Sequence, residues 1–400
     1  MKKIDLNRSK LTTFKGFIKF LSRETKRETK RLFFRYLRSI ELGKSYMDFR
    51  NLSYDKSYCS LRNNLVYYVN VAKKFNDYRF LTAVWLLEQR LGMYIESIEH
   101  EFESYNIHRA LPTDIKVLPT EQSQDSLFLS IKESNKEGIG AGVLYLGMVI
   151  FLSQFFPKTT LVVEKRLLSV WQKSLIEYSN INVKPFPSQP LKENTYKTAN
   201  ISILKKLCIK KVEDIEFYLK QYFFLDSKKQ KEYSYKYSKN PKLPIIGLTY
   251  KSSNPGKDSP DIKNWIWLIE NFQANYLILQ YGDISEDLEK FKIASKKSKS
   301  NIIYDSEIDL GGDLEEHFYQ ISTLDRLVCL ASSTAFFATS IGIYASMIVD
   351  DRHTRQFPIF SKKTPWHPKL TVFHKNKREY NVVFNDILKD LKKSFQNDKT

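Results

Sequence analysis

One loop of the sequence carries a lysine, serines and an asparagine directly after an apolar run. The run 244–250 (PIIGLTY) leads into Lys251 and Ser252 and on to Lys257. A lysine supplies charge to a phosphate group, and hydroxyls and amides supply hydrogen-bond donors. The GK[ST] order of a P-loop is absent. The segment therefore predicts either a phosphate-contacting loop or an ordinary solvated loop.

A second candidate follows the apolar run 326–330 (RLVCL). Ser332, Ser333 and Thr334 stand there, ahead of a helical run of small residues. Serine is a favoured N-cap residue, so we expect Ser332 at the N-cap. Hydroxyls and unpaired N–H groups at the start of a helix can hold an anion. The turn predicts a diphosphate contact, with simple helix capping as the alternative.

The third candidate is a glycine loop, Gly138, Gly140 and Gly142, between an expected strand and an expected helix. Small residues there let backbone N–H groups approach an anion closely. The spacing is not that of the dinucleotide fingerprint, and no strand-end acid follows at the expected distance. Close packing of the helix on the sheet is the alternative explanation for these glycines.

Apolar runs alternate with helical patterns from residue 127 onward, as a fold that positions such loops requires. We expect strands at 127–131, 160–164, 244–250, 276–280, 301–304, 326–330 and 346–350. This alternation predicts an α/β fold with parallel sheets and helices on both faces. Two facing Rossmann-like domains place a cleft between the carboxyl ends of their strands, where ligands bind.

The pattern divides the chain into four segments. The polar, basic stretch 227–244 marks the boundary between the two α/β halves, and 184–192 is expected to be a proline-containing loop. A final amphipathic helix is expected at 383–395. The expected segments are a basic helical region (1–105), a linker (106–126) and two Rossmann-like domains, an N-terminal one (127–235) and a C-terminal one (236–400).

The composition favours anionic partners. The 400 residues include 64 Lys and Arg against 45 Asp and Glu, a formal charge of +19. Phosphates, nucleotides, nucleic acid and acidic membrane surfaces all suit such a balance. Three widely spaced cysteines argue against a disulfide framework and fit a reducing compartment. No HxxxH or CxxC pair occurs, so we expect no metal site.

The N-terminal residues 1–45 form a basic amphipathic pattern, with apolar residues at helical spacing. Such a segment either adsorbs to an anionic membrane or packs on the protein with a solvated charged face. No apolar signal region follows Met1–Lys10, which predicts a cytoplasmic location, with peripheral membrane attachment as an option. The uncharged stretch 138–157 is long enough to span a bilayer, but its flanking strands favour a buried helix.

The order of segments from residue 127 resembles the family-nine, heptosyltransferase-like glycosyltransferases. It is more distantly similar to the protein O-linked N-acetylglucosamine transferases. The matching pieces include EGIGAGVLYLGMVIFLSQFFPKTTLVVEKRLLSVW, IIGLTYKSSNPGKD, YLILQYGD and EIDLGGDLEEHFYQISTLDRLVCLASSTAFFATSIG. The resemblance implies a GT-B fold, a nucleotide-sugar donor held mainly by the C-terminal domain, and no metal or other cofactor. The absence of a DxD motif agrees with this.

The resemblance also implies roles for the residues of the polar loops. Lys251 matches the basic residue that contacts donor phosphate, and Ser332–Thr334 match the polar turn under the diphosphate. Trp366 and Pro368 match a characteristic Trp-x-Pro.

Further positions match the family near the nucleotide. Gln280, Tyr281 and Gly282 match a strand-end turn near the base. Asp313 fits an acidic position ahead of a helix. Arg355 matches an upstream basic residue, with an uncertainty of one position.

Two departures from the family pattern concern the chemistry. Ala141 stands where the family usually has the acid that acts as base. Ala331 and Phe336 stand where it usually has an aspartate and a histidine. Alanine and phenylalanine can neither take a proton nor offset leaving-group charge. A replacement base is then expected among Glu133, Glu137 and His353.

Two functions remain open at this level. The first is a metal-independent glycosyltransferase that moves a sugar from a nucleotide diphosphate to a glycan, lipid or protein acceptor. The second is a catalytically degenerate GT-B protein that acts as a binding or scaffold module, which the two departures favour. Nucleic-acid binding is disfavoured because the many aromatic residues fall mostly on apolar faces.

Overall fold

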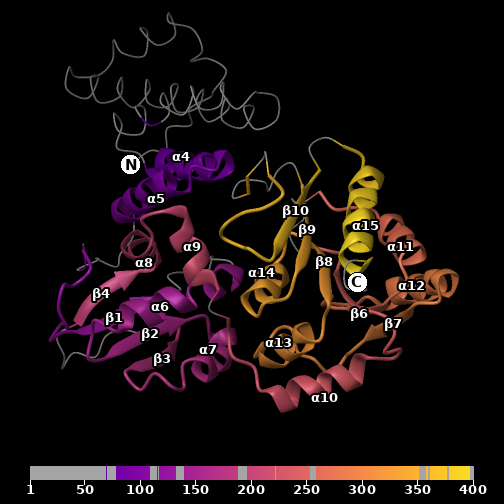
Figure 1. The fold of residues 1–400 in the computed structure, drawn as a ribbon, viewed down its shortest axis with the longest axis horizontal. Helices are drawn as coiled ribbons and strands as arrows, with labels where there is room; N and C mark the ends of the chain where they lie inside the picture. The colour runs from indigo at the N-terminus through magenta and orange to yellow at the C-terminus, as the bar shows by residue number, and fades with distance from the viewer. Residues whose placement is uncertain are drawn as a thin grey trace, which may run out of the picture. The chain divides into compact units, whose positions relative to one another are not determined.

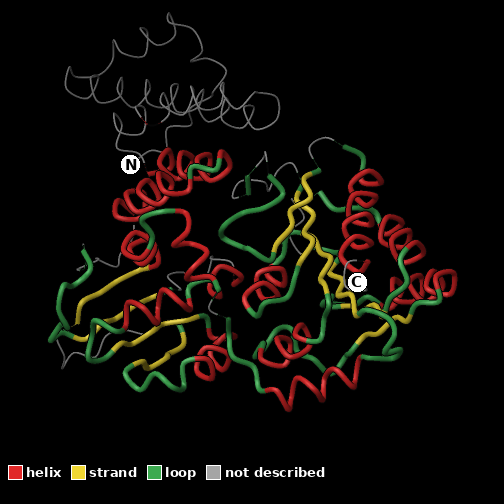
Figure 2. Tube along the Cα trace, in the orientation of Figure 1, coloured by secondary structure: helices red, strands yellow, loops and turns green. Residues whose placement is uncertain are grey.

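In the part of the chain that the computed structural model describes, ten β-strands make up two separate sheets, and every pair of neighbouring strands is parallel (Figures 1 and 2). The chain divides into two units, residues 1–80 and 81–400, and both sheets belong to the second. The structure describes residues 78–108, 117–131, 139–187, 196–220, 222–252, 258–350, 361–375 and 378–396, together with positions 69, 115, 357 and 358. The basic segment 1–45 lies outside these residues.

The first sheet has the strand order β3-β2-β1-β4. Its strands are β1 (Ser126–Ser130), β2 (Thr159–Val163), β3 (Ile181–Pro185) and β4 (Tyr196–Asn200). The two central strands are buried along nearly their whole length, as expected for a sheet covered on both faces. The edge strand β3 buries only Val183, because one of its sides has no neighbouring strand.

The helices described in the first half precede, separate or follow these strands along the sequence. They are α4 (Tyr78–Leu91), α5 (Tyr94–His108), η2 (Ile139–Val143), α6 (Leu146–Ser153), η3 (Lys165–Leu167), α7 (Leu168–Ser174), α8 (Ile201–Cys208) and α9 (Val212–Leu219). Helix α8 begins at Asn200, whose side-chain oxygen accepts from the N–H groups of Ser202 and Ile203. Buried Lys205 of α8 pairs with buried Glu101 of α5 at 2.8 Å.

The second sheet has the order β10-β9-β8-β5-β6-β7. Its strands are β5 (Ile245–Thr249), β6 (Asn275–Ile278), β7 (Asn301–Tyr304), β8 (Arg326–Leu330), β9 (Ala345–Val349) and β10 (Leu370–His374). Numbered within the half, this is the Rossmann order 6-5-4-1-2-3, and the first sheet has the order 3-2-1-4. The prediction of two Rossmann-like domains in an α/β, GT-B-like chain is confirmed.

The helices of the second half lie between its strands in sequence. They are α10 (Ser227–Tyr237), α11 (Ile262–Asn271), α12 (Ser285–Ser298), α13 (Glu315–Ser322), α14 (Ser333–Ser340) and α15 (Tyr380–Gln396). Helix α10 occupies the polar stretch predicted as a boundary and packs on α13. Asp226 begins it by accepting from the N–H of Lys229.

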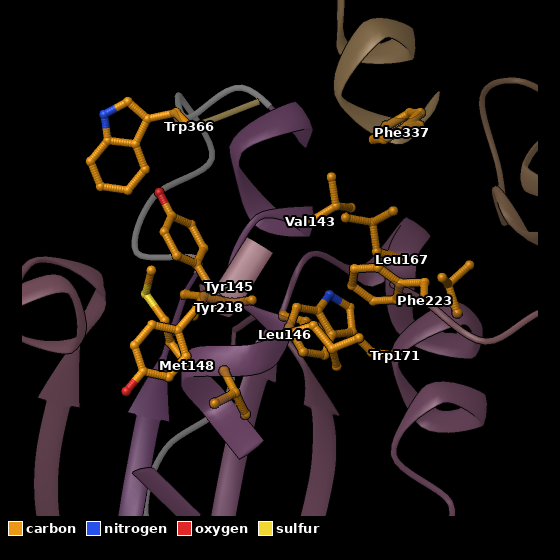
Figure 3. Close-up of a cluster of buried hydrophobic side chains, with 14 of the residues drawn as sticks. Val143, Tyr145, Leu146, Met148, Leu167, Trp171, Tyr218, Phe223, Phe337 and Trp366 are labelled. Atoms are coloured by element: carbon orange, nitrogen blue, oxygen red, sulfur yellow. The ribbon is translucent and has the colours of Figure 1, made fainter. Parts of the chain in front are cut away.

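One apolar cluster runs from the first half into the second. Figure 3 shows Val143 and Leu167 between Trp171 and Phe337 of α14. Trp171 and Phe223 meet edge to face, with their ring centroids 4.9 Å apart. The two sheets therefore belong to one folded unit, with a shared apolar contact beside the site described below.

The uncharged stretch 138–157 forms two short helices, η2 and α6, rather than one long one. Helix α6 has eight residues and buries most of them against its neighbours. In the described part of the chain, no helix combines the length and apolar character needed to cross a bilayer. The stretch is apolar because it is packed, as its flanking strands predicted.

Candidate functional site

Both polar loops of the sequence leave the second sheet at the point where its strand order reverses. Strands β5 and β8 are neighbours in the sheet, and their connections run to opposite sides. Ligands of open α/β sheets bind outside the carboxyl ends of strands at such a switch point. The topology therefore brings Lys251, after β5, and Ser332, after β8, to one place.

A cleft of about 540 Å³ lies at this switch point. Seven predicted residues line it: Lys251, Ser252, Gln280, Tyr281, Ser332, Ser333 and Thr334. Residues that the sequence analysis missed complete the wall, among them Arg166 of η3 and His317 of α13. The cleft is thus shared by both halves, because Ile139 and Arg166 come from the first.

Lys251 is held by two side chains, those of Gln280 and Asp287. The N–H groups of Tyr250 and Lys251 donate to Oε1 of buried Gln280, at 3.0 and 2.9 Å. The ammonium group pairs with Asp287 in the first turn of α12. Asp287 also accepts from the Tyr250 hydroxyl at 2.9 Å. Gln280 therefore positions the backbone of the loop that carries Lys251. The resemblance had implied only that Gln280 lies near the nucleotide base.

The start of α14 is open toward the cleft. Ser332 is at the N-cap position with extended backbone angles, as predicted, but its side chain does not cap the helix. Its hydroxyl instead lies 3.4 Å from that of Thr249. The first N–H groups of α14 therefore have no side-chain cap, and a helix N-terminus of this kind favours an anion.

The charges on the wall have one sign. Arg166 and Lys251 contribute cationic groups, and no carboxylate lies among the described residues that line the cleft. Arg166 is fixed from the second half, since its carbonyl oxygen accepts from the N–H of Leu314 at 3.0 Å. Two basic residues, Lys165 and Arg166, follow the apolar strand 159–163 after Glu164, and this pair was the available signal in the sequence for Arg166.

A second hollow of about 410 Å³ adjoins the cleft and shares Gln280, Tyr281, Leu310 and Gly311 with it. Predicted Gly282 lines this hollow with a φ of +85°, a left-handed conformation that glycine adopts without strain. Its other side carries the acidic residues Asp305, Glu307 and Asp309. The combined site is basic at one end and rich in hydrogen-bond acceptors at the other.

Phe336, which stands where the resemblance implies a histidine, makes a ring contact. The Phe336 ring stacks on buried His367, with centroids 4.5 Å apart and planes 14° apart. A Cβ at Gly140 would overlap this ring and lie 3.1 Å from the Cα of Ser333. Gly140 therefore lets η2 pack on the start of α14, the packing role that was the alternative to anion binding.

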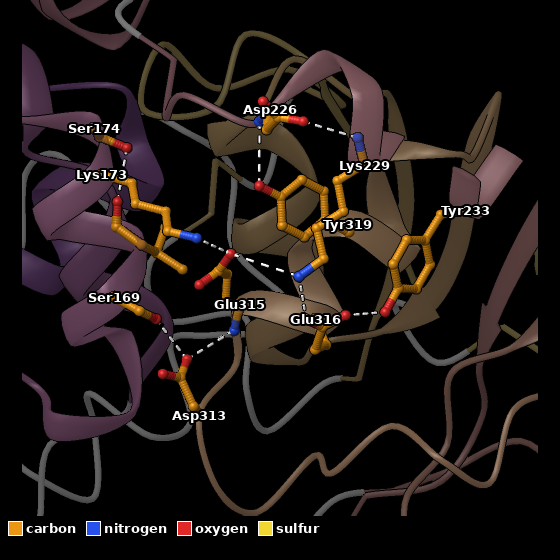
Figure 4. A network of polar contacts seen from close by, with 11 residues as sticks. Ser169, Lys173, Ser174, Asp226, Lys229, Tyr233, Asp313, Glu315, Glu316 and Tyr319 are labelled. Atoms are coloured by element: carbon orange, nitrogen blue, oxygen red, sulfur yellow. Dashed lines mark hydrogen bonds and ion pairs between the residues drawn. The ribbon is translucent and has the colours of Figure 1, made fainter. Parts of the chain in front are cut away.

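Asp313 does not line the cleft. Its carboxylate accepts from the hydroxyl of Ser169 at 2.6 Å and from the N–H of Glu315 at 2.9 Å (Figure 4). Beside it, Lys173 of α7 pairs with Glu315 of α13. These contacts join α7 of the first half to the start of α13 in the second.

Several predicted residues fall outside the described part of the chain. They are Gly138, Arg355 and the three possible bases, Glu133, Glu137 and His353. The side chain of Ala141 is not described either. Among the described residues, no group of three or more His, Cys, Asp or Glu side chains is arranged to hold a metal ion.

Comparisons with known proteins give weak likenesses. No protein-family model and no curated protein matches the chain. Among solved structures, it is similar to a family 9 glycosyl transferase from Veillonella parvula, at 11% identity and a TM-score of 0.43, over 68% of this chain and 91% of that one. It is also similar to the Escherichia coli ADP-heptose lipopolysaccharide heptosyltransferase II, at 8% identity and a TM-score of 0.45, over 69% of this chain and 100% of that one. With TM-scores below 0.5, these likenesses add nothing to the fold, which stands on the sheet topology itself.

Proposed function

We propose that the cleft binds a nucleotide-diphosphate sugar and that the protein transfers the sugar to a glycan, lipid or protein acceptor. One observation carries the proposal: a cationic cleft without described carboxylates lies at the switch point of a Rossmann-ordered sheet. The similar solved structures include an E. coli heptosyltransferase with ADP-2-deoxy-2-fluoro heptose, which is in keeping with the proposal.

The two ends of the site suit the two ends of a nucleotide. Lys251, Arg166 and the uncapped start of α14 suit the diphosphate, because each places positive charge or N–H donors at the cleft. The adjoining hollow, with its carboxylates and amides, suits the hydroxyl and N–H donors of a nucleoside.

In this proposal, the cationic end assists departure of the nucleoside diphosphate. Negative charge develops on the leaving phosphate as the sugar is transferred, and preorganised charges at that position lower the barrier. Transfer then needs no metal ion. The proton of the acceptor hydroxyl goes to a base outside the described cleft wall, with Glu133, Glu137 and His353 as the candidates.

A second candidate function is binding without turnover. The contact between Gly140 and Phe336, and the stack of Phe336 on His367, replace ionisable groups with apolar packing beside the cleft. A protein with this change can retain the donor site and use it to hold a ligand or partner.

The test is a thermal-shift screen of the full chain against nucleotide-diphosphate sugars. A ligand present at 100 times its dissociation constant stabilises the folded state by about 2.7 kcal/mol. We expect one donor to raise the melting temperature, and Lys251→Ala to weaken its binding by roughly tenfold or more. Lys292→Ala removes an exposed lysine that pairs with Glu289 on α12, and we expect it to leave the shift intact.

The outcomes separate the two functions. Release of nucleoside diphosphate in the presence of EDTA, from a donor that binds, supports a metal-independent transferase. Binding without release supports the scaffold. No shift with any donor contradicts both.

The acceptor is proposed to lie at an anionic membrane surface, because the net charge is +19 and residues 1–45 are strongly basic. The full chain should sediment with vesicles that contain phosphatidylglycerol and not with phosphatidylcholine vesicles. Equal binding to both, or none, contradicts this part of the proposal.

A further inference from the structure

His317 is a buried imidazole in the wall of the proposed donor cleft. It lies in the first turn of α13, is 3% exposed and lines the cleft together with Leu314. Its neighbour on the inner side is Phe337, which it meets edge to face. Nothing in the resemblance discussed above gives this position a role.

A chain of hydrogen bonds fixes the imidazole from behind. Asp305 pairs with Lys236 and accepts from the hydroxyl of Tyr237. The side chain of Gln320 also interacts with the Tyr237 hydroxyl. Oε1 of Gln320 lies 3.1 Å from Nδ1 of His317.

Only one assignment of donors and acceptors along this series of contacts is consistent. The Asp305 carboxylate only accepts, so the Tyr237 hydroxyl donates to it, and its oxygen is left to accept from the amide NH₂ of Gln320. The amide oxygen then faces His317 and accepts from Nδ1–H. In a neutral imidazole, a proton on Nδ1 makes Nε2 an acceptor.

Nε2 remains available to a ligand. No described residue hydrogen-bonds it, and it is not among the described side-chain atoms that are sealed from solvent without a partner. Since His317 borders the cleft, a buried acceptor with a fixed lone pair is offered to whatever occupies it.

We propose that Nε2 of His317 accepts a hydrogen bond from a hydroxyl group of the bound nucleotide sugar and so selects hydroxylated ligands. The inference rests on the proposed function, because it concerns the same cleft. The hydroxyl belongs either to the ribose or to the transferred sugar. Asp305, Tyr237 and Gln320 are positioning residues that act through His317.

The protonation state of His317 agrees with this role. Burial lowers the pKa of the imidazole to about 4, and the hydrogen bond with Gln320 only partly opposes the shift. The ring is therefore neutral at pH 7. A group with so low a pKa is a weak base, so His317 recognises a hydroxyl rather than removing its proton.

The test compares ligands that differ by one hydroxyl. Binding of ADP, GDP and UDP, of their 2′-deoxy and 3′-deoxy forms and of the corresponding nucleotide sugars is measured by calorimetry on the full chain. A ribose contact predicts that the wild type prefers a ribonucleotide to one deoxy form by about tenfold, and that His317→Phe abolishes this preference. A contact with the transferred sugar instead predicts that His317→Phe lowers the ratio of nucleotide-sugar to nucleotide affinity by a similar factor.

His367→Phe is the matched control, since His367 is equally buried but is not among the residues that line the cleft. It should keep both ratios. If His317→Phe fails to fold, Tyr237→Phe removes only the hydroxyl behind Gln320, and we expect it to lower the same ratio by at least threefold. The inference is overturned if a folded His317→Phe variant keeps both affinity ratios of the wild type. If Tyr237→Phe is measured in its place, unchanged ratios in that variant overturn the inference. Neither result affects the proposed function. Absence of nucleotide binding by the wild type overturns the proposed function as well.

Discussion

Gln280 determines where the lysine loop lies. Its amide oxygen accepts from two successive backbone N–H groups, those of Tyr250 and Lys251. Gln280 itself is 3% exposed. Truncation to alanine leaves both donors without this acceptor, one of them buried and the other partly buried. Each such group costs on the order of 1 kcal/mol or more.

We predict that Gln280→Ala lowers the free energy of unfolding by about 2 kcal/mol and weakens binding of the donor nucleotide at least tenfold. Urea denaturation and calorimetry measure the two effects. Gln273→Ala is the control, because Gln273 is exposed and donates to one carbonyl. If the Gln280 variant is as stable as the Gln273 variant, the conformation of the Lys251 loop does not depend on Gln280.

The absence of a side chain at Gly140 is required for the contact between η2 and α14. We predict that Gly140→Ala destabilises the protein by roughly 1–3 kcal/mol, since the new methyl group meets the Phe336 ring and the backbone of Ser333. Gly142→Ala should cost less, because its nearest neighbour is a Leu167 methyl group at 3.5 Å.

Adding Phe336→Ala to Gly140→Ala separates the two contacts. The double variant should lose less stability than the sum of the single changes, because the ring no longer opposes the methyl group. Strict additivity would place the strain elsewhere.

The cleft was predictable where a single segment carries the signal. Lys251 and Ser332 each follow an apolar strand, so their position at a strand's carboxyl end was readable from the sequence. His317 was not, because its role depends on Gln320 one turn away and on Tyr237 of α10. Asp313 was expected near the nucleotide and instead bonds Ser169, a partner 144 residues away.

At the scale of elements, burial explains only part of which strands the sequence revealed, because β7 was predicted although it is mostly not buried and β10 was missed although it is fully buried. The run 326–330 matches β8 residue for residue, because both neighbours of this strand bury it. The strands that were not predicted, β3, β4 and β10, are all at sheet edges. Strand β4 (YKTAN) has neither an apolar run nor alternation and is held by its pairing with β1.

The last helix is tied to the sheet by a buried cation. Arg326 of β8 donates to Asp390, Ser394 and Ser346, and burial lowers the pKa of its guanidinium group. We predict that Asp390→Ala costs roughly 3 kcal/mol of stability, because it leaves this charge without its counterion.

Asp386→Ala provides the comparison on the same helix. Its partner Arg378 is about a third exposed, at 34%, so the loss should stay below about 1 kcal/mol. Urea denaturation of both variants at pH 7 decides. Equal losses would mean that solvent reaches Arg326.

At the scale of the whole molecule, two buried histidines make stability depend on pH. Burial lowers the pKa of His317 to about 4 and that of His367 to about 3, against an ordinary value of 6.5. In the unfolded chain both rings take up protons as the pH falls below 6.5, and in the folded protein they stay neutral. Their contribution to stability is complete above pH 6.5 and is lost as the pH falls toward 4.

We predict that the free energy of unfolding falls by on the order of 4 kcal/mol between pH 7 and pH 5, roughly 1 kcal/mol per pH unit from each histidine. Urea denaturation at several pH values measures the slope. His367→Phe should halve it, whatever its effect on stability at pH 7. A slope that this variant leaves unchanged assigns the effect to other groups.

The two sheets also share no strand, and each is continuous along the chain. All strands of the first lie between residues 126 and 200, and all of the second between 245 and 374. During synthesis from the N-terminus, the first sheet can pair fully while the second is still being translated. Most of the residues that line the cleft belong to the second half of the chain. The carbonyl oxygen of Arg166 can accept from the N–H of Leu314 only after that residue has been synthesised. The proposed ligand site of a nascent chain therefore forms last. A ligand of this site stabilises only those molecules in which both halves have been synthesised.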